Sequence, residues 1–305
     1  MKRKPSIVVV GAGAVGAATA AILHDSGRAE VSVCARGERE ERYRREGFLI
    51  NGRRYFFTVA SGDSGRPADY LIVAVKNYNL DEAIEEMKPH VGPETLIISL
   101  LNGVTAVPRL REEFGASAVP WAMILAIDAH RHANEIQYTS QGTIYCGYEP
   151  RLAVEYGAKV QRAAEFLRKC GVRVAVPEDI MREIWFKFMI NVSINQWSAV
   201  LRKPYRFFTE SGHGRILLEK TMLEVIRLSR ARGTGLSEED IPKVMAILGT
   251  LSPEGKTSML QDVEAGRRTE VEAFAGTMIK LSRESGLSAP INEVLYHAIL
   301  GIEES

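Results

Sequence analysis

Three polar residues in the stretch WFKFMINVSINQW, residues 185–197, have the types and the spacing to do chemistry. Lys187, Asn191 and Asn195 lie four positions apart, so on a helix they share one face. Most of the residues around them are aromatic or aliphatic, and burial among such side chains lowers the pKa of a lysine. Such a lysine can donate a proton to an alkoxide formed from a carbonyl, while the two amides hold substrate oxygens.

A solvated helix face is the alternative interpretation of this polar stripe. A lysine and two asparagines could face water on an amphipathic helix. Solvated faces elsewhere in this chain mix acidic and basic side chains, as in NLDEAIEEMK at residues 79–88, whereas Lys187 is almost the only charge on this face. We therefore favour the interpretation that the stripe belongs to an active site.

A second group of candidate residues lies near the start of the chain, where GAGAVG follows the β-branched run SIVVV and precedes an alanine-rich segment. In a GxGxxG turn the first glycine permits the tight turn and the second lets the backbone approach a pyrophosphate. The third lets the helix pack closely on the strand. The order of strand, turn and helix predicts a dinucleotide-binding turn made of Gly11, Ala12, Gly13, Ala14, Val15 and Gly16.

The residue after the second predicted strand selects between the two nicotinamide dinucleotides. An acidic side chain there accepts hydrogen bonds from the ribose of NAD, but this chain has Arg36. A guanidinium matches the 2′-phosphate of NADP(H), so NADPH is the predicted cofactor. Two alternatives stay open: Arg36 and Arg39 could belong to a solvated charged loop, and the nearby Glu38 could serve NAD.

The elements that would position these residues alternate between strand and helix. Strands predicted at SIVVV, EVSVCA, ADYLIVAVK and TLIISLLNG, with helices between them, indicate a Rossmann-type, doubly wound and mostly parallel sheet. The pair Asn51-Gly52 in FLINGRRYFFTVA predicts a hairpin with a type I′ turn. Residues 119–148 are strand-like but less regular, and we expect them to complete the sheet, before a helix and a last strand at VRVAV.

The pattern changes after Pro177. Nearly everything from Asp179 to Leu300 has helical periodicity. The breaks in this periodicity lie near Lys203-Pro204, Gly233-Thr234-Gly235, Ser252-Pro253 and Gly286. We predict an α/β domain followed by an all-α domain: an NADP-binding Rossmann domain at residues 1–178 and a helical substrate and catalytic domain at residues 179–305.

The composition excludes several classes of function. The chain has 305 residues with 39 basic against 38 acidic side chains, which removes the electrostatic argument for nucleic acid. Three scattered cysteines predict neither a disulfide framework nor a zinc site and favour a reducing cytoplasm. No apolar run predicts a membrane span. His130 and His132 could share a strand face, but no third ligand is nearby, so we expect no metal.

These residues together resemble the ketopantoate reductase (2-dehydropantoate 2-reductase) family, and the resemblance runs nearly from end to end. It rests on the GAGAVG start, Arg36, Lys76 in VAVKNYN and Asn102 in SLLNG. The segments EIWFKFMINVSIN and TSMLQDVEAGRRTEVEAFAG match more specifically than the glycine pattern. The family has an N-terminal Rossmann domain and a helical C-terminal domain, which agrees with the pattern in this chain.

The resemblance also implies roles for individual residues. It makes Lys187 the general acid, and it makes Glu270 the carboxylate that contacts the reacting oxygen and helps to position that lysine. It assigns the substrate's carboxylate and hydroxyl to Asn191, Asn195 and Ser258. It assigns the meeting point of nicotinamide and substrate to Asn102 and Lys76. Without the resemblance, Ser258 and Glu270 could equally be a helix-start residue and an exposed acid.

The activity that follows is the NADPH-dependent reduction of ketopantoate to pantoate, a step of pantothenate and coenzyme A biosynthesis, in a protein that could form a homodimer. Two alternatives stay open. One is a related reductase that acts on another 2-oxo acid or an imine. The other is a catalytically silent NADPH-binding sensor, which would have no use for a general acid.

Overall fold

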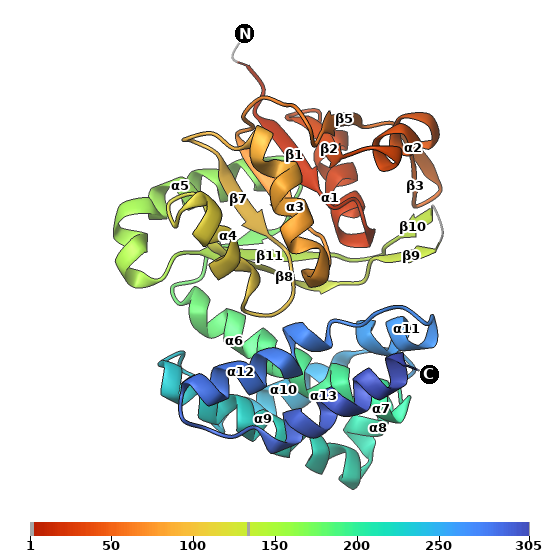
Figure 1. Cartoon of the computed structure of the whole chain (residues 1–305), viewed down its shortest axis with the longest axis vertical. Coiled ribbons are helices and arrows are strands. Elements are labelled where there is room, and N and C mark those ends of the chain that lie inside the picture. The colour runs from red at the N-terminus through yellow and green to blue at the C-terminus, as the bar shows by residue number, and fades with distance from the viewer. Residues whose placement is uncertain (1–2, 133–134, 305) are drawn as a thin grey trace. The chain divides into compact units, whose positions relative to one another are not determined.

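The computed structural model describes residues 3–132 and 135–304 of the chain (Figure 1). The chain divides into two compact units. The first contains Met1–Asn102 and Ala106–Ile180, and the second contains Gly103–Thr105 and Met181–Ser305. Each unit has its own architecture, and the two are described in turn.

The first unit is built on a five-stranded sheet in the order β5-β2-β1-β6-β7, in which every neighbouring pair is parallel. Its strands are β1 (Ser6–Val10), β2 (Glu30–Ala35), β5 (Thr58–Ser61), β6 (Tyr70–Val73) and β7 (Leu96–Ser99). The chain enters at the centre, builds outward to one edge and then crosses back, so the strand order reverses between β1 and β6. This is the arrangement of a Rossmann-type doubly wound sheet, and the predicted fold class is confirmed.

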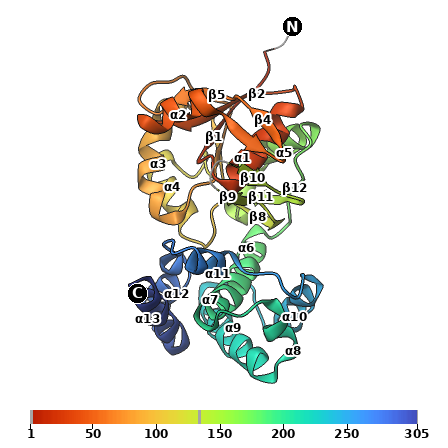
Figure 2. The same cartoon turned by 90° about the vertical axis from the view of Figure 1, so that its right-hand side faces the viewer.

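Helices cover both faces of this sheet. They are α1 (Ala14–Asp25), α2 (Glu38–Glu46), α3 (Leu80–Met87), α4 (Ala106–Phe114) and α5 (Pro150–Lys169). Helices α3 and α4 lie on one side of the sheet, with α1 and α5 on the other (Figure 2). All five residues of β1 are buried, which explains why this strand is a continuous β-branched run without alternation.

The predicted hairpin is present. Strands β3 (Phe48–Ile50) and β4 (Arg53–Tyr55) pair antiparallel, and the two turn residues both have positive φ, 47° at Asn51 and 77° at Gly52. Positive φ at both central positions defines the type I′ turn, which asparagine and glycine adopt most readily. The hairpin belongs to a separate four-stranded sheet with β9 (His130–His132) and β10 (Glu135–Gln137).

The prediction that residues 119–148 complete the parallel sheet is wrong. The segment supplies β8 (Trp121–Ile127) and β11 (Gln141–Gly147), which pair antiparallel with each other and form a third sheet with β12 (Val174–Ala175). Most of β11 alternates between buried and half-buried positions, as expected for a strand that packs with one face only. The less regular sequence pattern therefore corresponds to strands that form a sheet separate from the parallel one.

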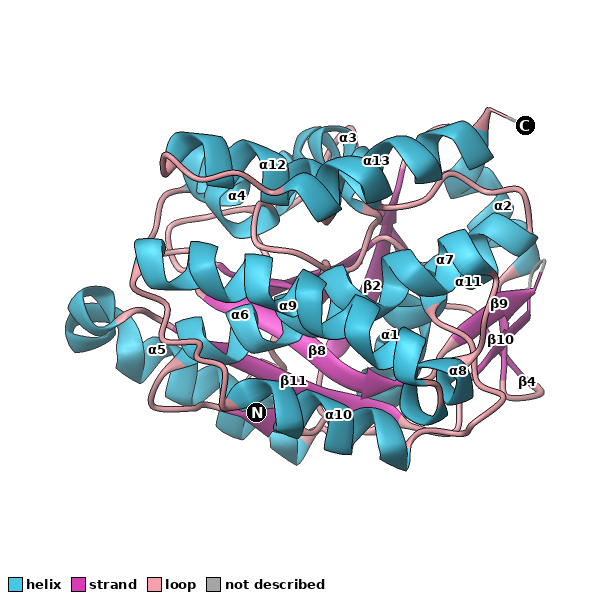
Figure 3. Ribbon diagram, turned by 90° about the horizontal axis from the view of Figure 1, so that it is seen from below, coloured by secondary structure: helices cyan, strands magenta, loops and turns pink. Residues whose placement is uncertain are grey.

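The second unit is helical, and all strands of the described residues belong to the first unit (Figure 3). Its helices are α6 (Ile180–Ile190), a π-helical turn η3 (Asn191–Asn195), α7 (Gln196–Leu201), α8 (Tyr205–Glu210), α9 (Gly212–Arg232), α10 (Asp240–Thr250), α11 (Ser258–Glu264), a 3₁₀ turn η4 (Val271–Ala273), α12 (Ala275–Glu284) and α13 (Pro290–Glu303). The four predicted breaks all fall between helices. Among the described residues, no helix is long and apolar enough to cross a bilayer.

Helix α9 forms the centre of this unit. Its apolar residues recur at helical spacing, and Leu218, Met222 and Val225 are completely buried. The helix begins at the cap residue Ser211, whose hydroxyl accepts a hydrogen bond from Gly214 N, and ends at Gly233 in the left-handed conformation. It packs against α8, α12, α13 and the π-helical turn, so it supports the segment that carries the predicted active-site asparagines.

Candidate functional site

The glycine-rich turn lies between β1 and α1, and its three glycines meet three different constraints. Gly11 has a φ of 90°, and a Cβ added there would lie 2.5 Å from a side-chain carbon of Val75. At Gly16 an added Cβ would lie 2.0 Å from the carbonyl oxygen of Gly11, so helix and strand approach too closely for any side chain. An added Cβ at Gly13 meets nothing within 4 Å among the described residues. The free space beside Gly13 leaves room for a phosphate to approach the backbone.

The other predicted cofactor residues follow the carboxyl ends of neighbouring parallel strands. Arg36 comes directly after β2, Lys76 follows β6, and Asn102 follows β7. The two loops after β6 and β7 are tied together, because Asn77 Nδ2 donates to the carbonyl oxygen of Asn102 over 3.0 Å. Ligands of open α/β sheets bind at this edge, where the strand order reverses. The fold therefore brings Gly11, Arg36, Lys76 and Asn102 to one edge of the sheet.

Arg36 makes contacts that the sequence did not predict. Its Nε lies 2.8 Å from Asp63 Oδ1, and its Nη2 donates to the carbonyl oxygen of Gly62 over 2.7 Å. Asp63 follows β5, which is the neighbour of β2 in the sheet, so only the strand order reveals this pair. The guanidinium is exposed enough to meet a ligand, but an anionic ligand would share it with a carboxylate.

The segment after Arg36 is a helix, so the alternative of a charged loop is wrong for Arg39. Glu38 begins α2, and Arg39 forms ion pairs with Glu82 and Glu86 of α3. Glu86 is almost completely buried, and burial raises the pKa of its carboxyl while Arg39 acts in the opposite direction. Arg39 thus has the role of compensating a buried acid, which separates it from Arg36 in function.

A further arginine contacts the phosphate-binding turn. Arg131, on β9, donates from Nη1 to the carbonyl oxygen of Ala12 over 3.2 Å. It is more than a hundred positions away in the sequence and belongs to an irregular segment, so no local pattern indicates this contact. Arg131 adds a positive charge beside the turn that is predicted to hold the dinucleotide phosphates.

Lys187 lies on α6 in the second unit, in surroundings that change its acidity. The side chain is partly shielded from water, and desolvation lowers the pKa of its ammonium to about 8. The charge of Glu270 acts in the opposite direction and raises the pKa of Lys187. Glu270 is itself only 6% exposed. The two residues to which the resemblance assigns proton chemistry are thus electrostatically coupled.

The helix that carries Lys187 is not a single α-helix, and this corrects the prediction. Residues Asn191–Asn195 form a π-helical turn between α6 and α7. Two turns of α-helix take about seven residues, and an α-helix would leave positions eight apart about 80° out of line. The π-turn accommodates about one extra residue. The eight steps from Lys187 to Asn195 therefore complete about two turns, and the polar stripe is straighter than an α-helix allows.

Two of the predicted substrate residues, Asn191 and Asn195, belong to this stripe, and Ser258 lies on a helix that packs against it. Asn195 is buried and Asn191 is half-buried. Ser258 is the first residue of α11, which packs against the π-helical turn. The cap of α11 is Thr257, whose hydroxyl accepts a hydrogen bond from Leu260 N over 3.2 Å. Because Thr257 caps the helix, the exposed Ser258 is not needed as the cap residue.

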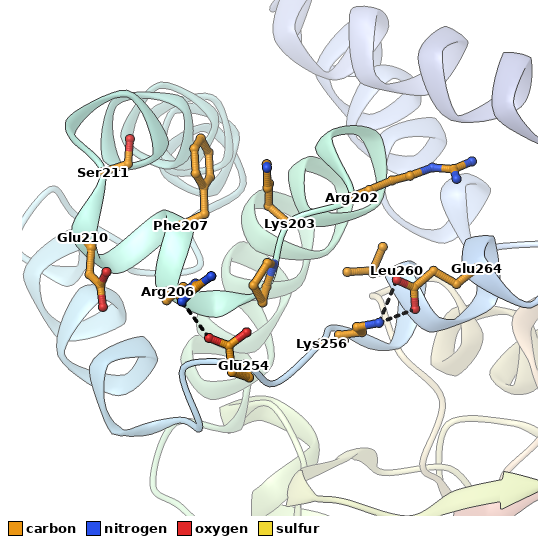
Figure 4. Close-up of a pocket in the computed structure, with 11 residues that line it drawn as sticks. Arg202, Lys203, Arg206, Phe207, Glu210, Ser211, Glu254, Lys256, Leu260 and Glu264 are labelled. Atoms are coloured by element: carbon orange, nitrogen blue, oxygen red, sulfur yellow. Dashed lines mark hydrogen bonds and ion pairs between the residues drawn. The ribbon is translucent and has the colours of Figure 1, made fainter.

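A cavity of about 630 Å³ lies in the second unit and holds none of the predicted substrate residues (Figure 4). Two ion pairs are drawn along its wall, Arg206 with Glu254 at 2.9 Å and Lys256 with Glu264 at 2.8 Å. Its lining is mainly charged and contains Arg202, Lys203, Pro204, Arg206, Phe207, Glu210, Ser211, Glu254, Lys256, Leu260 and Glu264. These pairs compensate much of the charge, and the cavity is distinct from the polar stripe.

Comparison with known proteins relates both units to one family. A model described as ketopantoate reductase PanE/ApbA matches residues 7–151, and one described as ketopantoate reductase PanE/ApbA C terminal matches residues 179–303. The sequence is 26% identical over 312 residues to a 2-dehydropantoate 2-reductase of Archaeoglobus fulgidus, with 99% of each chain covered. The match to this family therefore covers most of the first unit and nearly all of the helical second unit.

Two solved structures show the same fold. A ternary structure of D-mandelate dehydrogenase with NADH and anilino(oxo)acetate has a TM-score of 0.85 at 19% identity, with 98% of each chain covered. A dimeric ketopantoate reductase from Staphylococcus aureus has a TM-score of 0.80 at 20% identity, covering 98% of this chain and 99% of that one. The arrangement of a parallel sheet followed by a helical unit is thus common to proteins with different substrates.

Proposed function

Because the chain belongs to the ketopantoate reductase PanE/ApbA family of oxidoreductases, we propose that it reduces 2-dehydropantoate to pantoate with NADPH. This reaction is a step of pantothenate and coenzyme A biosynthesis. The observation that carries the proposal is Lys187, whose pKa is lowered to about 8 and which is coupled to Glu270. A group with this pKa is protonated at neutral pH and still a strong enough acid to release its proton.

The residues of the second unit have separate tasks in this reaction. NADPH, when bound, supplies the hydride for the C2 carbonyl carbon. Lys187 holds the proton and gives it to the carbonyl oxygen as negative charge develops there. Glu270 keeps the lysine protonated and oriented. Asn191, Asn195 and Ser258 hold the carboxylate and the hydroxyl of the substrate, and their fixed dipoles stabilise charge without reorganisation.

The residues of the first unit fit a dinucleotide. The open backbone at Gly13 and the N-terminus of α1 suit the pyrophosphate, because helix N-termini favour negative charge. Arg36 suits a 2′-phosphate, which supports NADPH as the cofactor. Lys76 and Asn102, after β6 and β7, are suited to the nicotinamide end. In the balanced reaction, the 2-oxo acid, NADPH and one proton give the 2-hydroxy acid and NADP⁺.

A second candidate is the reduction of another 2-oxo acid with NADH. Two observations favour it. The D-mandelate dehydrogenase that shares this fold is described with NADH and an oxoacetate derivative. In this chain Asp63 already occupies part of the hydrogen-bonding capacity of Arg36, which weakens the case for a 2′-phosphate. A silent NADPH sensor finds less support, because it has no use for a coupled lysine and glutamate.

The assembly and location of the protein are further parts of the proposal. We propose a homodimer, supported by the dimeric ketopantoate reductase of similar fold. A cytoplasmic location is supported by Cys34, Cys146 and Cys170, which are buried and unpaired thiols. Light scattering of the purified protein tests the first point, since a monomer at micromolar concentration contradicts it.

The test of the proposed activity is cofactor oxidation with a panel of substrates. Purified protein is given NADPH or NADH together with ketopantoate, benzoylformate or 2-oxoisovalerate, and absorbance of the reduced nicotinamide is followed. We expect the highest kcat/KM with NADPH and ketopantoate. A higher value with NADH and benzoylformate would favour the second candidate, and binding of NADPH without turnover on any substrate would favour the sensor.

A further inference from the structure

A buried amide lies directly after the π-helical turn. Gln196 is completely buried, and its Nε2 donates to the carbonyl oxygen of Val192 over 2.7 Å. The same nitrogen donates to Asn292 Oδ1 over 3.2 Å. Val192 belongs to the π-turn and Asn292 belongs to α13. The amide thus ties the turn that carries Asn191 and Asn195 to a helix about a hundred residues later.

The network continues to a buried carboxylate. Asn292 Nδ2 donates to Glu224 Oε2 over 2.8 Å, and the backbone N–H groups of Ile291 and Asn292 donate to Glu224 over 2.9 and 3.2 Å. Glu224 is 2% exposed and lies on α9. Its negative charge is stabilised by the first N–H groups of α13. Three helices are therefore joined at one point by hydrogen bonds that fix their relative positions.

The carbonyl groups of the widened turn receive donors from side chains. In a π-turn the N–H partners shift by one residue, which leaves the carbonyl groups at its ends poorly paired within the backbone. The hydroxyl of Ser193 lies 2.8 Å from the carbonyl oxygen of Met189 and 3.1 Å from that of Ile190. Gln196 serves the carbonyl group of Val192. Both side chains therefore donate to carbonyl groups just before or at the start of the π-turn.

We propose that Gln196, held by Asn292 and Glu224, is a positioning residue that keeps residues 191–195 in the π-helical register. In that register Asn195 stays in line with Lys187. Return to an α-helical register leaves Asn195 about 80° out of line with Lys187. The inference rests on the proposed function, because it assigns Gln196 a task in the same active site.

A purely space-filling role does not explain this amide. Gln196 Oε1 is buried and has no hydrogen-bond partner among the described residues. An unpaired buried polar atom is unfavourable, so methionine of similar length would satisfy packing without that penalty. The amide nitrogen explains why glutamine is present at this position, because it donates both to the π-turn and to Asn292.

The experiment compares Gln196→Met with a matched control. Methionine keeps the length and volume of the side chain and removes the donor. The control is Ser229→Ala. Ser229 is also completely buried, and its hydroxyl lies 2.8 Å from Thr234 Oγ1 and accepts a hydrogen bond from Leu236 N. It lies near the C-terminal end of α9. For each protein, kcat and KM for ketopantoate, the NADPH dissociation constant, the Tm and the pKa of Lys187 by NMR are measured.

We expect Gln196→Met to lower kcat about ten- to hundredfold, because small misplacements of catalytic groups have effects of this size. The pKa of Lys187 should change, while the dissociation constant of NADPH stays at the wild-type value. Ser229→Ala should lower the Tm and leave kcat and the pKa of Lys187 unchanged. Wild-type kcat and lysine pKa in Gln196→Met overturn the proposal, as does an equal loss of kcat in the control.

A milder variant covers the case in which Gln196→Met does not fold. Ser193→Ala removes only the hydroxyl that serves the first end of the π-turn, and it should shift kcat and the pKa of Lys187 in the same direction. If the wild-type protein reduces no 2-oxo acid, the proposed function fails. The NMR pKa of Lys187 then still tests the positioning role, because it is measured without turnover.

Discussion

The phosphate-binding turn and the lysine-bearing helix are both predicted to act on negative charge, but they are built from different parts of the chain. The turn uses backbone: Gly11 and Gly16 are fixed by atoms that lie within a few residues or on the adjacent strand end. The helix uses side chains, and its Lys187 and Asn195 depend on Glu270 and on the network of Gln196. A backbone site is thus specified locally, while a side-chain site depends on the whole unit.

This difference has a consequence for substitution. In the turn, the space around each Cα decides the effect of a substitution, so two glycines of one motif can differ in how strongly an added methyl group destabilises the fold. On the helix, charge and register decide the outcome, so a residue without any contact to the substrate can matter as much as one that touches it. The following predictions contrast the two regions, beginning with the largest expected effect.

Lys187→Ala should lower kcat about 10²- to 10⁴-fold, because it removes the proton donor. The dissociation constant of NADPH should not change, since the cofactor residues belong to the first unit. Lys220→Ala, at an exposed lysine of the same unit, is the control and should keep wild-type kcat. Steady-state kinetics with ketopantoate and fluorescence titration of NADPH measure both effects. Wild-type turnover in Lys187→Ala would exclude the proposed acid.

Gly16→Ala and Gly13→Ala should separate stability from binding within one turn. The methyl at residue 16 meets the Gly11 carbonyl oxygen, so we expect a loss of about 1–3 kcal/mol in the free energy of unfolding. The methyl at residue 13 meets open space and should weaken NADPH binding at an unchanged Tm. Urea titration and calorimetric binding give the two quantities. Equal destabilisation by both variants contradicts the steric argument.

Arg36→Ala should raise the KM for NADPH and leave the KM for NADH nearly unchanged. Hydrogen bonds to a charged group contribute about 1.5–3 kcal/mol, so the expected loss is roughly 10- to 100-fold. Arg42→Ala, an exposed arginine of α2, is the control. The ratio of kcat/KM for the two cofactors is the measurement, and an unchanged ratio shows that Arg36 does not read the 2′-phosphate.

The pH profile tests the coupling of Lys187 with Glu270. A general acid must be protonated, so the rate of reduction should be constant below pH 8 and fall as the pH rises through the pKa of about 8. Glu270 raises that pKa, so Glu270→Gln should move the alkaline limb to lower pH. The profile of kcat between pH 5 and 10 gives the shift. Movement toward higher pH would falsify the assigned sign of the interaction.

Asp63→Asn should have the smallest effect. It removes the carboxylate that competes for Arg36, so NADPH should bind more tightly. Because exposed ion pairs contribute about 0–1 kcal/mol, the expected gain is at most about fivefold. Binding of NADH serves as the internal reference and should stay constant. Weaker NADPH binding in this variant means that Asp63 orients the guanidinium for its ligand and does not compete with it.

The sequence was sufficient where the relevant forces are local. The GxGxxG turn, the Asn51-Gly52 hairpin and the helix breaks depend on backbone conformations that a few residues impose, and each appears in the structure. The sheet assignment of residues 119–148 failed because strand pairing is a long-range choice. Alternation identified the strands, but nothing in it indicates which neighbour a strand selects.

The candidate site divides along the same line. Lys187, Asn191 and Asn195 were predicted from their spacing, since α6 and the π-turn that continues it carry all three. Asp63, Arg131 and Gln196 were not, because their partners lie on other strands and helices. The π-turn also escaped prediction: periodicity predicts a helix but does not distinguish a turn that holds one more residue.

That extra residue has a bearing on how this protein can change over generations. Loss of a single residue within 191–195 restores a regular α-helix, and since seven residues of α-helix complete the same two turns, everything that follows keeps its orientation. More than a hundred residues follow the turn, including α9 and α13. Such a deletion therefore needs no compensation in the rest of the unit. Its effect is confined to the polar stripe, because it removes the π-turn that carries Asn191 and Asn195.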